Sequence, residues 1–347
     1  MTSSQARLKQ IAGRTAITVA TLVIVVTIIV AGLWNYRATL GELAWPTYPE
    51  YEARPDAVTL TWLGVSTLLF DDGETQILID GFISRPSVVD IVFDVPVRSE
   101  VAQINQVLDQ YEMRRLAAII PVHSHFDHAM DIGAIANRSS ASILGSESTA
   151  RIAQGAGVPD DQIVIVEDDS EYQFGAFTIR LLRSRHAPIG WGGTVPFDGE
   201  IGTPLELPAP VSAWRTGEVY SIVISHADGT TVVQGSAGFR PGALDDVDAD
   251  VLLLGTWGLK SLGRDYTEQY WLAMITATGA KRILPIHFDD YTRPFGRIEL
   301  PPRILDDFVD AAGWLDEFRN IWDTDSRLFL PEFGRRVVLY PPPLPEA

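Results

Sequence analysis

The first long feature of the chain is an apolar run near its amino terminus. Residues 16–34 read AITVATLVIVVTIIVAGLW and contain no charged side chain. As a helix, this run is long enough to cross a hydrocarbon core of about 30 Å. Its many β-branched residues would also suit buried strands, but an uninterrupted apolar stretch of this length favours a helix that spans a membrane. We therefore predict one transmembrane anchor over residues 16–36.

The charges on the two sides of the run predict its orientation. Arg7, Lys9 and Arg14 precede it, whereas Arg37 is followed mainly by glutamates. Basic residues favour the cytoplasmic side of a span, so we expect residues 1–15 in the cytoplasm and the remainder outside, in the periplasm or the extracellular space. A cleaved signal peptide is the alternative. The run is long for such a peptide, and its small-residue cleavage signal is unconvincing.

After the run, the pattern changes to short strands and helices. Pro46, Pro49 and Pro55 make residues 37–56 an extended linker, and residues 57–347 are expected to form one domain. Apolar runs predict strands at residues 59–70, 76–80, 116–120, 141–144, 163–166, 174–182, 218–224, 230–234, 251–255, 282–286 and 336–339. Helical spacing predicts helices at residues 99–115, with a serine available as its cap, and at 127–137, 147–154, 267–278 and 303–322.

The densest group of reactive side chains follows the predicted strand at residues 116–120. It consists of His123, His125, Asp127 and His128. On a loop and a helix start, these side chains can converge on one point, which suits a metal ion with imidazole and carboxylate ligands. An isolated histidine is more often structural, but three of the six histidines fall here. Because an open zinc site needs three protein ligands, four candidates predict two metals, or one metal with a carboxylate partner.

Further candidates lie at the ends of other predicted strands. His186 and His287 each follow a strand, where α/β sheets tend to place functional groups, so we expect both to be ligands. Asp80 ends another strand and is either a turn-forming residue or a carboxylate near the metal. His226 lies beside a predicted hairpin turn and is interpreted as an ordinary exposed residue.

Composition limits both the chemistry and the partners. The chain has 45 Asp and Glu against 27 Lys and Arg, a net charge of -18, and its basic residues are scattered. Nucleic acid is therefore an unfavourable partner. A hydrophobic content of 46% indicates a folded protein. The absence of cysteine excludes disulfides, thiolate metal sites and cysteine nucleophiles, which leaves histidine and carboxylate as the ligand set.

Together these residues resemble the metallo-β-lactamase superfamily of metal-dependent hydrolases. The resemblance covers roughly residues 58–339 and is carried by His123-x-His125-x-Asp127-His128, His186, His287, Thr61-Trp62-Leu63-Gly64 and Ile77-Leu78-Ile79-Asp80. Within the superfamily, the chain is similar to the branch containing ascorbate-6-phosphate lactonase and the phospholipase D that acts on N-acyl-phosphatidylethanolamine. The resemblance implies an α/β fold, a four-layer αββα sandwich, preceded here by the transmembrane helix. It does not imply a substrate, because this fold hosts many chemistries.

The resemblance also implies which residues bind which metal. The two implied ligand sets are His123, His125 and His186 for the first metal, and Asp127, His128 and His287 for the second. The family usually bridges both ions with an aspartate, but the corresponding segment, Val233-Gln234-Gly235-Ser236-Ala237-Gly238-Phe239, has Ser236 at that position. A neutral hydroxyl supplies no charge, so at least one site should be weaker. The departure disfavours iron oxygenases, which need two histidines and a carboxylate, and the flavodiiron type has Glu where this chain has His125.

The expected activity is hydrolysis with one or two zinc ions. Zinc lowers the pKa of its bound water to about 7, which gives a hydroxide that can attack an ester, a lactone or a phosphodiester. Asp127 is expected to orient the hydroxide or to act as a base. Asp80 and Ser236 are candidates for positions behind the ligands. The anchor favours a small-molecule or lipid-like substrate, and the sequence does not indicate an oligomeric state.

Substrate contacts are expected from the loops around the site. Candidates for meeting an anionic group are Arg185, Lys260 and Arg264, and candidates for an apolar wall are Trp191, Phe197, Trp214 and Trp257. Each of these alone is more often a solvated charge or ordinary packing. Two other functions stay open: a degenerate, non-catalytic metal-binding protein of the same fold, and a nucleic-acid-processing hydrolase, which the acidic composition and the outside location weaken.

Overall fold

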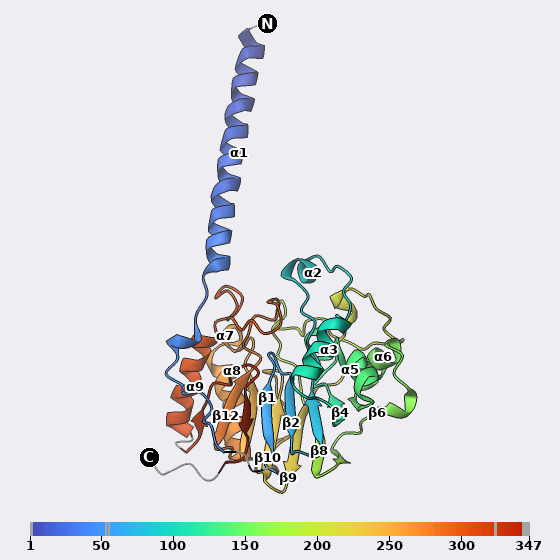
Figure 1. Ribbon diagram of the computed structural model, residues 1–347. Coiled ribbons are helices and arrows are strands. Elements are labelled where there is room, and N and C mark those ends of the chain that lie inside the picture. Colours follow the sequence, from blue (N-terminus) through green and yellow to red (C-terminus); the bar gives the residue numbers. More distant parts are fainter. Residues whose placement is uncertain (1–2, 53, 55, 323–324, 342–347) are drawn as a thin grey trace.

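The computed structural model describes residues 3–52, 54, 56–322 and 325–341, and within them two sheets form the centre of the domain (Figure 1). Each sheet has seven strands among the described residues. Pro55 of the predicted linker and the proline-rich tail from residue 342 onward lie outside the described residues.

The first sheet has the strand order β14-β1-β2-β3-β4-β5-β6. Its strands are β1 (Thr59–Trp62), β2 (Leu68–Asp71), β3 (Gln76–Ile79), β4 (Leu116–Ile120), β5 (Ser142–Gly145), β6 (Ile163–Ile165) and β14 (Arg336–Val338). Strands β1, β2 and β3 pair antiparallel, whereas β3, β4, β5 and β6 are parallel. The parallel strands therefore end at the same edge of the sheet.

The second sheet has the order β13-β12-β11-β10-β9-β8-β7. Its strands are β7 (Ser170–Phe174), β8 (Phe177–Arg183), β9 (Tyr220–His226), β10 (Gly229–Gln234), β11 (Val251–Gly255), β12 (Arg282–Ile286) and β13 (Arg327–Leu328). Strands β7 to β10 form an antiparallel meander, and β10 to β13 are parallel. Parallel pairing needs crossover connections, which here include helices.

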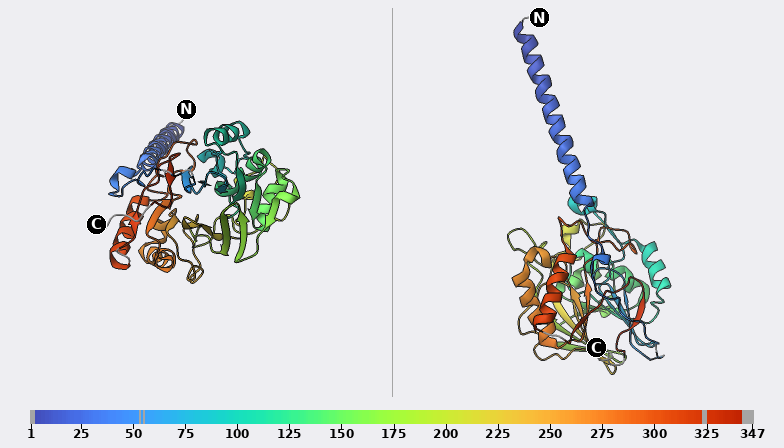
Figure 2. Two further views of the ribbon diagram at one scale, coloured as in Figure 1. Left: turned by 60° about the horizontal axis from the view of Figure 1, so that its bottom comes forward. Right: turned by 90° about the vertical axis from the view of Figure 1, so that its left-hand side faces the viewer.

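Helices cover the outer faces of both sheets, as two views show (Figures 1 and 2). On the first sheet these include α3 (Val101–Gln110), α4 (Phe126–Ala129), α5 (Ile132–Ser139) and α6 (Glu147–Gly155), whereas α2 (Val88–Val92) lies at the end of the domain nearest α1. On the second they are α7 (Leu259–Leu262), α8 (Arg264–Trp271), which continues as a π-helical turn at Leu272–Thr276, and α9 (Phe308–Trp322). The order of layers is therefore helix, sheet, sheet, helix, the predicted αββα sandwich.

Alternation along the buried strands explains this layering. Every residue of β1, β2 and β3 is buried. Phe70 and Ile77 pack into the core between the sheets, whereas Leu69 and Leu78 pack into the core beneath the helices of the first sheet. Because successive side chains of a strand point to opposite faces, a continuously apolar strand has to be covered on both sides.

Several predicted elements have different bounds in the structure. Residues 59–70 form two strands instead of one, because the chain turns back at Gly64 and Val65, both of which have positive φ angles. Ser99 does not cap α3; its Oγ donates to the carbonyl of Met130 instead. Helix α9 begins at Phe308, five residues later than predicted, after a turn whose residue Arg303 hydrogen-bonds to the segment that follows α1.

Helix α1 (Ser3–Asn35) projects away from the domain (Figure 1). Its part from residue 11 to residue 35 is long and apolar enough to cross a membrane, and the apolar window is unburied. A signal sequence would satisfy the same criteria. The following segment, predicted as a linker, lies against the domain: Trp45 and Tyr48 are buried, and the Tyr48 hydroxyl donates to the carbonyl of Leu339 at 2.8 Å.

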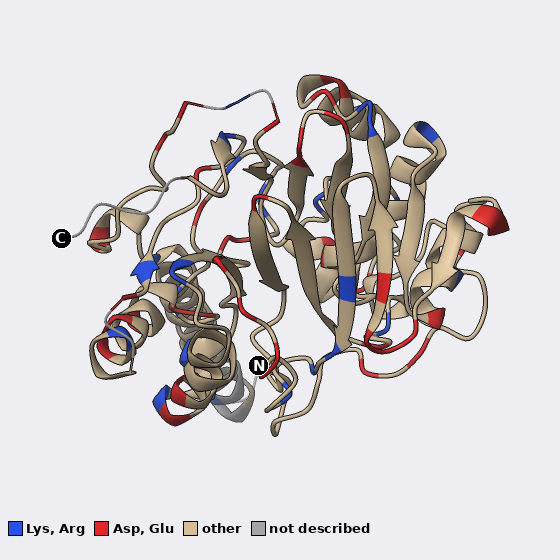
Figure 3. Cartoon of the chain, turned by 90° about the horizontal axis from the view of Figure 1, so that it is seen from below, with Lys and Arg blue, Asp and Glu red and all other residues tan. Residues whose placement is uncertain are grey.

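Charged positions are distributed over the domain without a continuous basic region in the view from below, where Lys and Arg are interspersed among Asp and Glu (Figure 3). Many of the arginines pair with carboxylates. Arg180, for example, contacts both Asp169 and Asp246. Such exposed pairs contribute little to stability. Each contains one positive and one negative charge, so the net charge of the chain remains negative.

Candidate metal centre

The segment after β4 places four potential ligands at the edge of the first sheet. His123 lies in the loop, His125 immediately precedes α4, and Asp127 and His128 occupy the first turn of that helix. All four side chains are buried. Two backbone hydrogen bonds fix the loop: Val122 donates to the Asp80 carboxylate at 2.8 Å, and Ser124 donates to the carbonyl of Thr216 at 3.0 Å.

Two segments of the second sheet bring further imidazoles to the same place. His186 follows β8, and His287 follows β12 directly. The backbone N–H of His287 donates to the carbonyl of Val65 at 2.8 Å, across the space between the sheets. His287, Val65 and Asp80 all have positive φ angles, which are strained for residues with a Cβ and recur at functional sites.

The structure brings the predicted ligands together in two sets. The sets are His123, His125 and His186, and Asp127, His128 and His287, and the donor atoms within each set lie within 4.8 Å of one another. The rings of His123 and His128, one from each set, have centroids only 4.0 Å apart. The two sets are therefore adjacent.

Hydrogen bonds at the outer nitrogens orient three of the imidazoles. Nδ1 of His128 lies 2.7 Å from the Asp80 carboxylate, and Nδ1 of His186 lies 2.7 Å from its neighbour's carbonyl. For His125 the outer atom is Nε2, 2.9 Å from the hydroxyl of Thr216. A proton held at the outer nitrogen leaves the inner nitrogen with a free lone pair, the arrangement usual for metal-binding histidines.

The inner nitrogens face one another closely enough to share a cation. His123 Nε2 and His125 Nδ1 are 2.9 Å apart. Tetrahedral zinc with Zn–N bonds of about 2.0–2.1 Å would separate two nitrogen ligands by roughly 3.3 Å, so a small relaxation would accommodate it. The donor set of five imidazoles and one carboxylate, without thiolates, fits a divalent metal of the zinc type.

Burial keeps the first set of imidazoles neutral. Burial, followed by repulsion from neighbouring imidazoles, lowers the pKa of His123 well below its ordinary value. It also lowers the pKa of His125 to about 3 and that of His186 to about 4. Neutral imidazole is the form that binds metal, so these side chains are ready to bind at neutral pH.

The second set contains the negative charge of the site. Burial alone would raise the pKa of Asp127, but the neighbouring His128 and His287 outweigh it, and the pKa lies below its ordinary value. The Asp127 carboxylate is 3.2 Å from His287 Nε2. For His128, the carboxylates of Asp80 and Asp127 overcome burial and raise the pKa. A fixed carboxylate beside two imidazoles is a natural cation-binding arrangement.

Comparison with known proteins gives one curated relative and many similar folds. No family model matches the chain. A UPF0173 metal-dependent hydrolase of Roseiflexus sp. (strain RS-1) is 27% identical over 164 residues, which cover 46% of this chain and 61% of the relative. The chain therefore matches about three-fifths of the length of that relative.

Solved structures share the layered architecture. CmlA, a diiron β-hydroxylase from Streptomyces venezuelae, superposes with a TM-score of 0.50 at 12% identity, covering 83% of this chain and 55% of that one. The metallo-β-lactamase fold protein YhfI from Bacillus subtilis has a TM-score of 0.48 at 16% identity, covering 81% and 99%. The present chain has two sheets between outer helices, with the candidate ligands at their common edge. Its fold is therefore similar to that of CmlA.

Within this αββα sandwich, Ser236 lies beside the ligands, but its hydroxyl bonds to the backbone. Its hydroxyl accepts from the N–H of Ala187 at 3.0 Å and from that of Gly238 at 3.4 Å. Gly238 has to be glycine, because a Cβ there would lie 2.1 Å from the carbonyl oxygen of Arg185. Ser236 thus holds the segment that carries His186, and it brings no charge to the space between the two ligand sets.

The ligands lie at the bottom of a small pocket next to a larger groove. The inner pocket has a volume of about 80 Å³, and its lining includes Phe197, Trp257 and Tyr291 together with four of the ligands. The outer groove, of about 580 Å³, shares His186 with the inner pocket and contains Arg185. A substrate could thus place a small reacting group inside and a larger remainder in the groove.

Four predicted substrate residues lie elsewhere. Trp191 is 97% exposed and does not line the inner pocket. Trp214 is fully buried in the core beneath the first sheet's helices. Lys260 pairs with Asp310 of α9 at 2.6 Å, and Arg264 pairs with Glu317 of the same helix at 2.7 Å. Their side chains therefore serve helix packing or remain in solvent, and none of the four lines the inner pocket.

The remaining candidates lie at or near the site. Phe197 and Trp257 line the inner pocket, and the Trp257 ring centroid is 6.0 Å from that of His287. Arg185 makes no ion pair with any residue that the structure describes. His226 is not an exposed residue as predicted. Its ring packs on Phe177 at 5.2 Å and is largely buried.

Two residues of the site were not predicted. Thr216 supports His125, and Tyr291 lines the pocket four residues after His287. Burial, then the charges of Asp127 and Asp290, raise the pKa of Tyr291, so its hydroxyl stays protonated and can donate. Tyr291 could have been predicted from its closeness in sequence to His287. Thr216 lies in an irregular segment whose sequence gives no such indication.

Proposed function

We propose that the protein is a metal-dependent hydrolase that uses zinc to cleave an ester, a lactone or a phosphodiester. The observation that carries this proposal is the meeting of four buried imidazoles, the half-buried His186 and one carboxylate in two adjacent sets, four of whose residues line a pocket. The relative from Roseiflexus, named a metal-dependent hydrolase, supports the same activity class. A serine or cysteine nucleophile is not needed for such chemistry.

The bound metal would supply Lewis acidity and acidify its coordinated water. His123, His125 and His186 would hold the first ion, and Asp127, His128 and His287 the second. With Ser236 in place of a bridging carboxylate, we infer that one of the ions is lost more readily. Histidine-rich, thiolate-free donors favour zinc, although other divalent metals accept the same ligands.

The chain's own groups would orient the substrate and move protons. The ionised Asp127 carboxylate can accept a proton from water or fix its orientation, and the Tyr291 hydroxyl can donate to an oxygen on which negative charge develops. Phe197 and Trp257 exclude water from the reacting group. Arg185 in the outer groove is suited to an anionic substituent.

The anchor guides the choice of substrate class. We infer that α1 spans a membrane with the amino terminus in the cytoplasm and the domain outside, since Arg7 and Arg14 precede its apolar part. Such a location favours an amphiphilic ester or phosphodiester, in line with the resemblance to the branch of N-acyl-phosphatidylethanolamine phospholipase D. A lactone, as in the ascorbate-6-phosphate lactonase of the same branch, is the second choice.

Metal content and hydrolysis, measured on the full chain, test the proposal. We expect bound zinc and turnover of bis-p-nitrophenyl phosphate, a p-nitrophenyl ester or a lactone. His186→Ala should lose metal and reduce turnover by at least about 100-fold, since an essential ligand is removed. His226→Ala, which changes the histidine outside the site, is the matched control and should keep both.

One other function has an observation in its favour. Ser236 in place of a charged bridge would also suit a metal-binding protein without efficient turnover. Bound metal with no hydrolysis across esters, lactones and phosphodiesters would support that role and contradict the hydrolase.

A further inference from the structure

Helix α2 presents an apolar surface to solvent. Val89, Val92 and Phe93 are 56%, 68% and 73% exposed, and their spacing of three and four residues places them on one side of the helix. Ser87 and Asp90 cap the helix reciprocally, with Ser87 N–H donating to the Asp90 carboxylate at 2.9 Å. The capped helix therefore keeps these apolar side chains in solvent, and an exposed apolar surface of this kind is typical of an interaction site.

The segment that carries α2 is fixed to the domain. The Asp94 carboxylate accepts hydrogen bonds from both the backbone N–H and the hydroxyl of Ser212. Val97 and Ala209 then pair through two backbone hydrogen bonds of 2.8 and 3.0 Å. The exposed apolar side chains are therefore part of a defined structure.

A second group of exposed apolar side chains lies where α1 meets the domain. The backbone N–H of Arg303 donates to the carbonyl of Tyr36 at 3.0 Å, and its guanidinium lies 5.5 Å from the centroid of the Tyr36 ring. The next residues, Ile304 and Leu305, are exposed, Ile304 by 60%. Two views show α2 at the same end of the domain as the base of α1 (Figures 1 and 2).

We propose that Val89, Val92, Phe93, Ile304 and Leu305, together the apolar end of the domain, insert into the interface of the lipid bilayer that α1 spans. This inference rests on the proposed membrane anchor. The apolar part of α1 extends to Asn35, and Arg37 is already bound to the Asp290 carboxylate at 2.7 Å and to the carbonyl of Leu300 at 2.6 Å. No flexible linker separates the span from the domain, so this end must lie at the membrane surface.

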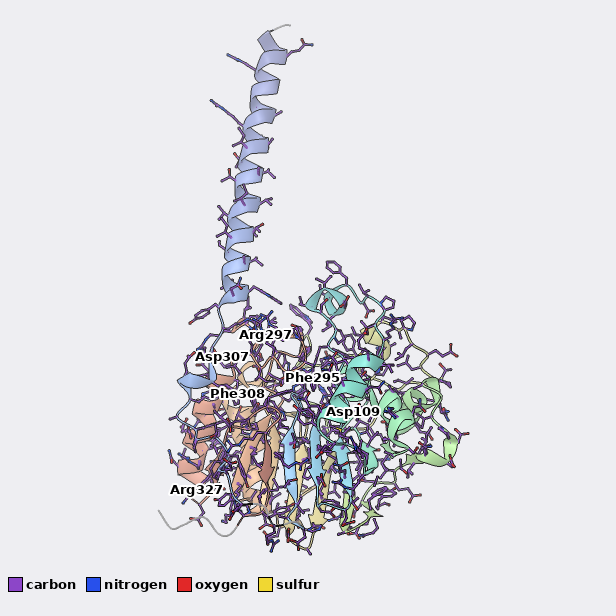
Figure 4. The ribbon with its side chains drawn as sticks, in the orientation of Figure 1. Asp109, Phe295, Arg297, Asp307, Phe308 and Arg327 are labelled. Atoms are coloured by element: carbon purple, nitrogen blue, oxygen red, sulfur yellow. The ribbon has the colours of Figure 1, made fainter. Side chains whose placement is uncertain are left out.

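The same contacts connect the membrane surface to the active site. Asp290, which binds Arg37, is followed by Tyr291, which lines the inner pocket. The rest of this loop, with Phe295 and Arg297, lies near the end of the domain from which α1 emerges (Figure 4). We infer that the pocket receives an amphiphilic substrate from the adjacent bilayer, which deepens the proposed function.

Depth-dependent quenching of single labels on the full chain tests the surface. The chain has no cysteine, so Val92→Cys can be labelled alone with an environment-sensitive fluorophore. Ile165→Cys on β6, another exposed apolar position, is the matched control, and Val25→Cys within α1 reports the span. Each protein is reconstituted into phosphatidylcholine vesicles with or without a doxyl-labelled phosphatidylcholine.

We expect loss of emission and a shift to shorter wavelength at positions 92 and 25, but not at 165. Quenching at 25 without quenching at 92 would leave the anchor standing and overturn the apolar end as a membrane contact. No quenching at either position would overturn both. Efficient disulfide cross-linking of unlabelled Val92→Cys without quenching at 92 would assign the surface to a second copy of the chain, against the proposal.

Hydrolysis by the same preparations separates this proposal from the proposed function. The double variant Val92→Ser with Phe93→Ser touches neither pocket nor ligands. It should lower kcat/KM for a vesicle-borne ester by about tenfold through lost apolar contact, and leave a water-soluble ester unchanged. Equal rates of wild type and variant on the vesicle-borne ester would contradict delivery from the bilayer. If the wild type is inactive but position 92 is still quenched, the proposed hydrolase activity is contradicted and the membrane contact of the apolar end is supported.

Discussion

Ser236 determines how much negative charge the two ligand sets share. In the wild type its hydroxyl accepts from the backbone N–H groups of Ala187 and Gly238, and no carboxylate lies between the sets at this position. Ser236→Asp would add one charge beside the site while retaining an oxygen acceptor for the backbone. We expect it to increase the occupancy of the more weakly held metal and to raise turnover, as measured by metal analysis after dialysis and by kcat/KM.

The neutral variant Ser236→Asn is the control for the change in size. It should leave metal occupancy near that of the wild type, because the amide supplies no charge. If Asp and Asn at position 236 give the same metal content and turnover, a missing bridging charge is not what limits the site.

Asp80 orients a ligand without facing the pocket itself. One of its oxygens accepts from Val122 N–H at 2.8 Å, and the other lies 2.7 Å from His128 Nδ1. In Asp80→Asn the carbonyl oxygen can serve only one of these partners, so the amide N–H₂ would face the ring nitrogen. Asn tolerates the positive φ of this position, so the backbone should persist. We expect metal affinity to fall about 10- to 100-fold in a chelator competition assay.

The melting temperature of the metal-free protein distinguishes positioning from folding. If Asp80→Asn acts through the orientation of His128, metal-free wild type and variant should unfold at similar temperatures. The stabilisation added by zinc should be smaller in the variant. A variant that loses stability without metal yet binds zinc with wild-type affinity would assign Asp80 a purely structural role.

Among the secondary-structure elements, the bounds of the buried parallel strands were predictable from the sequence, whereas those of the strands at the sheet edges were not. Strands β4, β11 and β12 have the bounds predicted from their apolar runs, because burial on both faces requires a continuous run. Strand β7 alternates half-buried with exposed residues at the edge of its sheet, and the two-residue strand β13 is too short to have a period. Their pairing depends on a neighbouring strand that the local sequence does not reveal.

The candidate site divides in the same way. Its histidines were predictable because each follows a strand, and strand ends of one sheet converge. Thr216 and Trp214 lie in an irregular stretch where burial is decided by tertiary packing, so the first was missed and the second was wrongly placed in the pocket. The pairing of Lys260 with Asp310 was not predictable, because it depends on the position of α9.

A buried carboxylate between α9 and the segment after β11 predicts a pH dependence of stability. Asp306 precedes α9 and accepts from the N–H of Gly258 at 2.9 Å, and burial raises its pKa to about 6 from an ordinary value of 3.8. Between these two values the folded state binds the proton that the unfolded state has lost. Stability therefore falls as pH rises from about 4 to about 6.

The variant Asp306→Asn keeps an acceptor for Gly258 and cannot ionise. Relative to this variant, the wild type should lose roughly 2–3 kcal/mol of unfolding free energy between pH 4 and pH 6, and little more above pH 6. Urea unfolding of both proteins across this range measures the difference. Asp109→Asn, at an exposed position of α3, controls for the loss of one carboxylate. A constant difference between wild type and Asp306→Asn at all pH values would contradict the prediction.

For the whole molecule, the site depends on closure of the two sheets. The first sheet supplies His123, His125, Asp127 and His128, and the second supplies His186 and His287. Neither sheet alone has a complete ligand set, since each of the two sets contains one residue from the second sheet. Metal binding should therefore report the packing of both layers and stabilise them together.

The junction between α1 and the domain gives a prediction for the complete chain. The partly buried Arg37 and the buried Asp290 form an ion pair at 2.7 Å, and Asp290 is also 3.3 Å from Arg293. Arg37→Ala removes one of the two cations and the donor to Leu300. It should lower the free energy of unfolding by about 1–3 kcal/mol, less than for a carboxylate left without a partner, because Arg293 remains. Denaturant unfolding of the full chain in detergent measures this change.

The control is Arg54→Ala, in the same segment as Arg37. Arg54 is exposed and lies 3.0 Å from Asp228, so its loss should lower the free energy of unfolding by less than about 1 kcal/mol. Equal losses in the two variants would show that the Arg37 contact does not fasten α1 to the domain.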